Sequence, residues 1–325
     1  MLIKTSTVVL LFLFTGLPMV MAGDYNNVYR FLQTPGSPHA SGLGGNVVSL
    51  PDTDVSSFMI NPAYLNEGQH RHIGIAYLNY ISDINTGVAS GSYHIQDYGT
   101  FGIGIKYMDY GNFTRTDAGG QEGGSFQAYD FALTAGWGYE IAEDLRTGVN
   151  LHSIRSSYDR YTSSALALSF GLHYTLNDQT HAGLTLNHLG RQITYFDERN
   201  EPLPLDIRAG ISRKLTHLPL RLSLTLHSLN QWEQRVHPDD ESPGFTSNLF
   251  RHLNFGGEFI FTENFQVRLG YDHRQHLEQK SDNRIDLAGM RFGLGLNVNR
   301  FRFDFSHNNF SDIGGLTQLA VQMRL

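Results

Sequence analysis

Closely spaced histidines and carboxylates are the first residues in this sequence whose types could support chemistry. They lie in three short runs, HRH, YDHRQH and HPDD, which contain His70, His72, His273, His276, His237, Asp239 and Asp240. Paired imidazoles can bind a metal ion, and a histidine beside carboxylates can act in acid/base catalysis. No run includes a cysteine or a sustained ligand cluster, and HPDD is also typical of an acidic turn. We therefore predict no metal, no cofactor and no catalytic residue.

Motifs that mark common enzyme classes are also missing from the sequence. There is no Gly-x-Ser-x-Gly, no His-Glu-x-x-His and no Gly-x-x-x-x-Gly-Lys, and the 325 residues include no cysteine. The net charge is −7, and the lysines and arginines are scattered rather than clustered, which argues against a nucleic-acid-binding surface. The sequence therefore indicates a protein that is not an enzyme and has no nucleic-acid partner.

A further set of charged residues alternates with apolar ones. Its members are Lys106, Arg221, Arg291, Arg302 and Asp304. In FRFDF, for example, Arg302 and Asp304 lie between three phenylalanines. Alternate residues of a strand point to opposite faces, so these charges would share one face of their strands and would line the lumen of a closed barrel. They could bind a carboxylate or phosphate ligand there. Alternatively, they could pair with one another and with a plug segment that fills the lumen, and we favour this pairing.

The elements that would position these charges are β-strands, because strict alternation runs through most of the chain. GTFGIGIKYMDYG sets Phe101, Ile103 and Ile105 against Gly102 and Gly104, which is the period of a strand with one apolar face. Fourteen such segments follow one another, at 73–81, 86–95, 99–110, 126–139, 144–156, 164–175, 179–190, 204–213, 220–230, 250–262, 265–274, 285–297, 300–308 and 316–325.

The connections between these segments indicate how the sheet closes. Apart from the first, they alternate between short ones of about two to six residues and longer ones of about 7 to 19 residues. A transmembrane barrel has tight periplasmic turns and long external loops. Aromatic residues near the segment ends would form the interfacial belts, namely Tyr107, Tyr110, Phe126, Tyr139, Tyr174 and Tyr271. The sequence thus predicts an all-β protein, a 14-stranded antiparallel transmembrane β-barrel.

Two segments of different amino-acid composition precede the predicted barrel. Residues 1–22 combine one lysine, an apolar run and small residues, which is typical of a secretory signal peptide. Residues 23–72 are rich in Gly, Pro, Ser and Asp, yet they include apolar residues such as Phe58 and Ile60 that a disordered tail would not need. We predict that 23–72 forms an N-terminal hatch or plug inside a barrel of residues 73–325, integral to the outer membrane.

The long external loops, 111–125, 191–203 and 231–249, are the predicted binding surface. Their candidate partner-binding residues are Arg115, Asp117, Phe196, Trp232, Glu233, Asp239 and Asp240. Trp232 could anchor a protein partner. It could equally belong to the aromatic belt, because it lies close to the end of a predicted strand.

A resemblance to a known family adds a specific function. GLGGNVVSLPDTDVSSFMINPAYLN, which contains the hatch motif Asn61, Pro62 and Ala63, resembles the hatch of the long-chain fatty-acid channels of the outer membrane. With NYISDINTGVASGSY, GTFGIGIKYMDYGNFTRTDAGG and the run from NHLGRQITYFDERN to LTLHSLNQW, it is similar to the PorQ family of type IX secretion proteins of Bacteroidota. The resemblance extends over nearly the whole chain beyond residue 22.

This resemblance implies a non-catalytic scaffold in the outer membrane. It would anchor a PorZ-like surface protein and support the PorU/PorV sortase complex, in contact with membrane lipid and lipopolysaccharide. The alternative is a hatch-gated channel for hydrophobic small molecules such as fatty acids. Such a channel needs an apolar path, whereas the inward faces are mainly Gly, Ser, Thr, Asn and charge, so the scaffold is favoured. A surface hydrolase, the third class, lacks a recognisable nucleophile and base.

Overall fold

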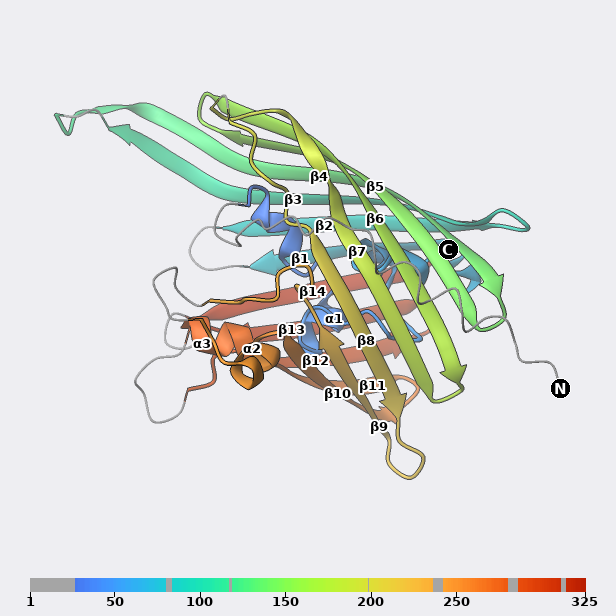
Figure 1. The fold of residues 1–325 in the computed structure, drawn as a ribbon. Helices are drawn as coiled ribbons and strands as arrows, with labels where there is room; N and C mark the ends of the chain where they lie inside the picture. The colour runs from blue at the N-terminus through green and yellow to red at the C-terminus, as the bar shows by residue number, and fades with distance from the viewer. Residues whose placement is uncertain are drawn as a thin grey trace.

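The protein is described by a computed structural model over residues 27–79, 84–116, 119–197, 199–235, 242–279, 286–310 and 314–325. Fourteen strands form one closed antiparallel barrel, in which neighbours in sequence pair and β1 pairs with β14 (Figure 1). The strands are β1 His72–Asn79, β2 Asn85–Ile95, β3 Gly99–Thr116, β4 Glu122–Ala142, β5 Leu145–Tyr158, β6 Tyr161–Asn177, β7 Thr180–Thr194, β8 Asp206–Lys214, β9 Leu220–Leu226, β10 Leu253–Thr262, β11 Phe265–Asp272, β12 Met290–Val298, β13 Phe301–Asn309 and β14 Gly315–Arg324. The predicted fold class is confirmed.

Closure of the barrel depends on the pairing of its first and last strands. β1 and β14 run antiparallel from His72 opposite Arg324 to Asn79 opposite Thr317. Each described strand therefore has a hydrogen-bonded neighbour on both sides. Strands in hydrocarbon require this arrangement, since an open edge would leave backbone polar groups without partners.

Alternation within the strands places apolar side chains on the outside of the barrel. In β3, Phe101, Ile103 and Ile105 are exposed, whereas Gly102 and Gly104 are buried. The same arrangement recurs around the barrel, where exposed side chains include Ile75, Leu151, Leu222, Leu269, Phe303 and Leu319. An apolar surface this wide suits contact with lipid rather than with water.

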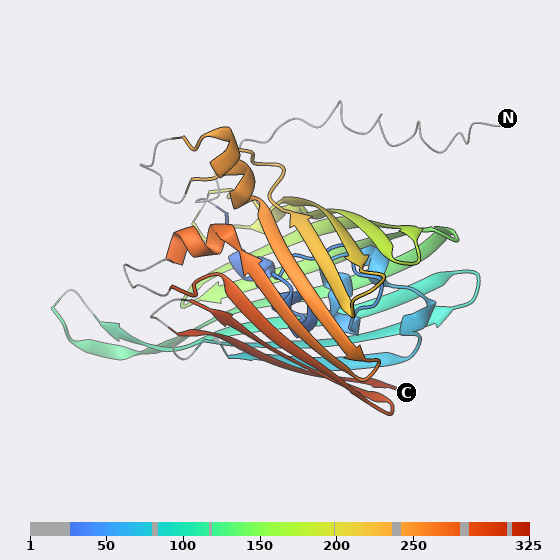
Figure 2. The same cartoon turned by 90° about the horizontal axis from the view of Figure 1, so that it is seen from below.

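The two ends of the barrel differ in their connections. At one end, which we call the turn end, the connections 143–144, 178–179, 263–264 and 299–300 have two residues each. The other end, the loop end, carries the β3–β4 hairpin and two short helices, α2 Phe245–Arg251 and α3 His273–Gln279 (Figures 1 and 2). None of the described helices is long and apolar enough to cross a membrane.

Some predictions for the loop end are wrong. Segment 111–125 is mostly strand, because β3 continues to Thr116 and β4 begins at Glu122, and the resulting hairpin projects beyond the rest of the loop end (Figures 1 and 2). The β5–β6 connection is only residues 159–160, although a longer loop is predicted there. Helices α2 and α3 lie where the sequence predicts loop and strand, since seven residues are too few to show a clear helical period.

The N-terminal segment, residues 27–71, lies inside the barrel and is called the plug (Figure 2). It contains η4 Arg30–Gln33, α1 Pro38–Gly42, η5 Val55–Met59, η6 Pro62–Tyr64 and η7 Glu67–Gln69. Four of these turns begin with side chains that accept a hydrogen bond from a nearby backbone N–H, namely Ser37, Asp54, Asn61 and Asn66. Such caps stabilise short turns that propensity alone would not. The result is a compact segment, and its action as a hatch stays a prediction.

Candidate functional site in the plugged lumen

Charged side chains from four strands form a buried network on one side of the lumen. Glu258 of β10 accepts hydrogen bonds from Arg268 Nε of β11 at 2.9 Å and from Arg221 Nη1 of β9 at 2.5 Å. Asp304 of β13 accepts from Arg268 Nη1 at 2.6 Å and from Arg302 Nε at 2.7 Å. We call these five residues the ionic side. Three arginines thus share two carboxylates, and Asp52 of the plug lies 4.0 Å from Arg302 Nη1 as a third, so the buried charges are paired.

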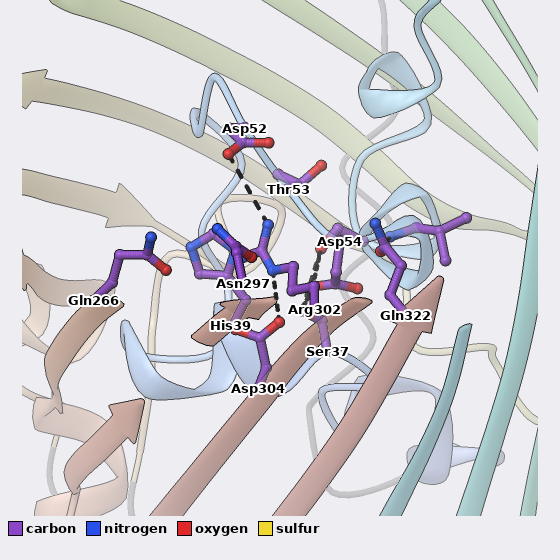
Figure 3. Close-up of polar contacts among 12 residues, drawn as sticks. Ser37, His39, Asp52, Thr53, Asp54, Gln266, Asn297, Arg302, Asp304 and Gln322 are labelled. Atoms are coloured by element: carbon purple, nitrogen blue, oxygen red, sulfur yellow. Dashed lines mark hydrogen bonds and ion pairs between the residues drawn. The ribbon is translucent and has the colours of Figure 1, made fainter. Parts of the chain in front are cut away.

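His39 of α1 connects the plug to the ionic side (Figure 3). Its Nδ1 lies 2.7 Å from Arg302 Nη2, and its Nε2 lies 3.1 Å from Glu258 Oε1. Because an arginine can only donate, Nδ1 is the acceptor, so Nε2 carries the proton and donates to Glu258. Burial, with Arg268 and Arg302 nearby, lowers the pKa of His39 and favours the neutral imidazole. One neutral side chain thus bridges an arginine and a carboxylate.

Asp54 ties two turns of the plug together and places them beside β14 (Figure 3). Its carboxylate accepts hydrogen bonds from the hydroxyls of Ser37 and Ser57. The next residue, Val55, donates its N–H to Gln322 Oε1 of β14 at 2.6 Å. The plug is therefore held to the barrel by neutral as well as ionic hydrogen bonds.

The predicted hatch motif presses against β5 and β6. Asn61 Nδ2 donates to the carbonyls of Val48 at 2.8 Å and Leu172 at 3.3 Å. Asn61 Oδ1 accepts from the Ala63 N–H at 3.0 Å. A Cβ atom at Gly171 would lie 2.1 Å from Asn61 Oδ1, so the close approach requires glycine in the wall. The motif thereby fixes the middle of the plug against the barrel.

Across the barrel from the ionic side, the contacts of the plug with the glycines of β3 are apolar. A Cβ atom at Gly102 would lie 2.9 Å from Leu65 Cδ2, and one at Gly104 would lie 3.2 Å from Phe58 Cζ. Phe58 and Leu65 are almost completely buried. We call these four residues the glycine side. Here the plug packs closely against bare backbone, and its carbonyls at Phe58 and Thr34 accept hydrogen bonds from Asn150 and Lys106 of the wall.

A cavity of about 380 Å³ lies at the loop end of the plug. Its apolar walls are Phe31 of the plug with Ile84, Met108, Tyr110, Phe310 and Leu316. Tyr110 points inward and donates its hydroxyl to Asp130 at 2.6 Å, so its predicted place in the interfacial belt is wrong. A cavity of this size can accommodate a small molecule.

All five charges predicted to face the lumen point inward. Arg221, Arg302 and Asp304 belong to the ionic side. Lys106 donates to the carbonyl of Thr34 in the plug. Arg291 donates from Nη2 to Asp272 Oδ2 at 3.1 Å and to Gln275 Oε1 at 2.8 Å. These charges therefore contact protein groups, as expected for a filled lumen.

The candidate partner-binding residues that the structure describes are Arg115, Phe196, Trp232 and Glu233. Asp117, Asp239 and Asp240 lie outside the described residues. Arg115 is on the projecting hairpin and forms an exposed ion pair with Asp159. The ring of Phe196 packs 5.2 Å from that of Tyr158, measured between centroids. Arg115 and Phe196 therefore both contact the end of the β5–β6 hairpin, at Asp159 and Tyr158.

Trp232 lies in an aromatic group beside α2. Its ring stacks on His252 at 5.0 Å and lies 5.7 Å from Phe245, which is 70% exposed. Next to it, Glu233 pairs with Arg235 at 2.6 Å on the surface. This arrangement tests neither predicted role of Trp232, so the partner anchor and the belt residue both stay predictions.

Sequence analysis missed three members of the site: His39, Glu258 and Arg268. The alternation in FGGEFIF and FQVRLGY places Glu258 and Arg268 on inward faces, so pattern alone could have found them. No local sequence pattern identifies His39, because its partners are more than 200 residues away in sequence. HPDD lies outside the described residues. Within the described ranges no group of three or more His, Cys, Asp or Glu side chains could hold a metal ion.

Comparisons with known proteins show similarity in the fold. No family model and no curated protein matches the sequence. The CymD monoaromatic hydrocarbon channel is similar in structure, with a TM-score of 0.53, 14% identity and coverage of 90% of this chain and 97% of that one. The Pseudomonas putida toluene transporter TodX gives 0.54 and 11%, covering 89% and 96%. The chain therefore has the fold of an outer-membrane β-barrel channel, and the similarities found give no support to the PorQ assignment.

Proposed function

We propose that the chain is an integral outer-membrane channel that admits small hydrophobic molecules at its loop end and is closed by the plug. The loop-end cavity carries this proposal, because about half of the residues that line it, including Phe31 and Met108, are apolar. These side chains can surround a small hydrophobic ligand, and the polar residues of the lining, among them Arg30 and Gln275, lie beside them. CymD is a monoaromatic hydrocarbon channel and TodX is a toluene transporter, which agrees with this cargo.

A packed apolar cluster continues from this cavity into the barrel. Phe310 and Leu316 of the cavity pack with Leu78 and Val88 in one cluster, and Met59 of the plug packs against it. The sequence favours a scaffold because the inward faces are largely polar, whereas the channel requires this cluster to open into an apolar route for the cargo. A molecule that follows this route would pass Gly102 and Gly104, which carry no charge, while Lys106 on the same strand is engaged with the carbonyl of Thr34.

Uptake of radiolabelled toluene by intact cells would test the proposal. Cells of a host without its own hydrophobic channel should take up toluene several-fold faster when they carry the chain. Met108→Arg places a charge in the cavity and should return uptake to the host level, whereas Met108→Leu, which keeps volume and polarity, should preserve it. Equal uptake with and without the wild-type chain would overturn the channel.

A surface scaffold is a second proposal, favoured by the exposed aromatic side chains at the loop end. Phe245 is 70% exposed and Trp232 is 41% exposed, and aromatic residues of this kind anchor protein partners. The partner would be a PorZ-like surface protein, with the PorU/PorV complex nearby. Affinity capture of the tagged chain from solubilised membranes would test this. Recovery of such proteins with wild type but not with Trp232→Ala supports it, and recovery of the barrel alone contradicts it.

A further inference from the structure

A second cavity adjoins the apolar one at the loop end. Its volume is about 210 Å³, and it lies between the plug and the ends of β8 and β11, close to α3. Arg30, Gln33 and Gln275 line both cavities. The two spaces are therefore neighbours with opposite character, one mostly apolar and one polar.

Charges in the polar cavity are balanced. Three arginines and three carboxylates line it: Arg30, Arg208, Arg274, Asp206, Asp272 and Glu278. Arg208 Nε lies 2.6 Å from Asp206 Oδ2, Arg274 Nε lies 2.7 Å from Glu278 Oε1, and Asp272 pairs with Arg291 at 3.1 Å. All three carboxylates are thus already paired, as are Arg208 and Arg274, and Arg30 is exposed. The lining therefore favours a ligand group without net charge.

The cavity nevertheless holds unused hydrogen-bonding capacity. His227, which is 5% exposed, lines it and contacts Ser228 Oγ through Nδ1 at 3.1 Å. Among the described residues its Nε2 is buried and has no hydrogen-bond partner. Leaving such an atom without a partner is costly. Since the serine hydroxyl can either donate or accept, Nε2 can serve as acceptor or donor, which suits a hydroxyl or an amide.

We infer that the cargo of this channel is an uncharged amphiphile with an apolar body and an amide or hydroxyl head group. This inference rests on the proposed function and specifies its cargo. The body occupies the apolar cavity beside Met108, and the head group reaches His227 in the polar cavity. A plain hydrocarbon would leave Nε2 without a partner, and a carboxylate would lie beside Asp206 and Asp272, whose arginine partners are already engaged.

Three probes of equal shape would test the inference: 4-ethylbenzamide, 4-ethylbenzoate and 4-ethyltoluene. Saturable binding of each to the full mature chain in lipid nanodiscs is measured with radiolabelled probe, and binding to empty nanodiscs is subtracted. We expect the amide to bind about tenfold more tightly than either analogue, because the analogues leave polar groups unpaired or add a charge. His227→Phe should reduce amide binding to the level of 4-ethyltoluene, and His227→Gln should largely preserve it.

The outcomes separate this inference from the proposed function. If 4-ethyltoluene or the benzoate binds as tightly as the amide, the inference is wrong while the channel stands. If His227→Phe folds and binds the amide as wild type does, the head group does not reach His227 and the inference is again wrong. If none of the three probes binds saturably to the wild-type chain, the proposed function fails as well.

Discussion

The ionic side and the glycine side of the lumen hold the same plug by different means. On the ionic side, His39 of the plug bonds to Glu258 and Arg302 of the wall. On the glycine side, Leu65 meets the bare backbone of Gly102. Directional bonds between buried charges fix one orientation, whereas apolar contacts tolerate small shifts. The comparison teaches that a side-chain network of buried charges anchors the plug on one side, whereas apolar fit and hydrogen bonds to plug carbonyls hold it on the other.

Removal of Glu258 should produce the largest effect, because it leaves Arg268 and Arg221 buried without their shared carboxylate. We expect Glu258→Leu to lower the free energy of unfolding by about 4 kcal/mol. Urea unfolding in detergent micelles would measure it. Glu263→Leu, at the exposed turn after the same strand, is the matched control and should change stability little. Equal loss in both variants would show that the buried carboxylate of Glu258 stabilises the barrel no more than an exposed one does.

Truncation of Phe58 tests the glycine side. Phe58 is fully buried in the plug, and Phe58→Ala should cost about 3 kcal/mol through lost contacts and the cavity left behind. The same urea titration applies. Phe113→Ala on the projecting hairpin, where the ring is 43% exposed, is the control. A loss for Phe58→Ala no greater than for the control would mean that the plug does not pack closely there.

Much of the fold could be predicted from sequence, but the site could be predicted only in part. Alternation is a local property, so GTFGIGIKYMDYG reveals which side chains face outward without knowledge of any partner. The pairing of Glu258 with His39 depends on how the plug enters the barrel, which no local pattern records. Tyr110 was misassigned for a related reason, since its position near a strand end fits either face until the register is known.

Acidification should weaken the ionic side moderately. The pKa of His39 is lower in the folded state than its ordinary value of 6.5, so the stability it contributes is complete above that value and is lost as pH falls below it. The loss attributable to this residue is at most about 1.4 kcal/mol per pH unit. Unfolding measured at pH 7.5 and 5.5 should show a smaller difference for His39→Gln than for wild type. An identical pH dependence in both would contradict the neutral bridge.

The smallest effect is expected for an ion pair outside the lumen. Arg115 and Asp159 pair at the loop end, where the arginine side chain is 52% exposed. Arg115→Ala should change the free energy of unfolding by less than about 1 kcal/mol, because water screens exposed charges. A loss comparable with that of Glu258→Leu would show that pairing, rather than burial, sets the strength of the ionic side.

Ion conductance of the intact chain in planar lipid bilayers tests the central claim most directly, namely that the plug fills the lumen and is anchored on the ionic side. We expect the wild-type chain to carry almost no steady current. Glu258→Leu should raise the current clearly, and Glu263→Leu should leave it unchanged. A large steady current through the wild-type chain, equal to that of Glu258→Leu, would contradict the claim, because it would show that the plug does not close the barrel.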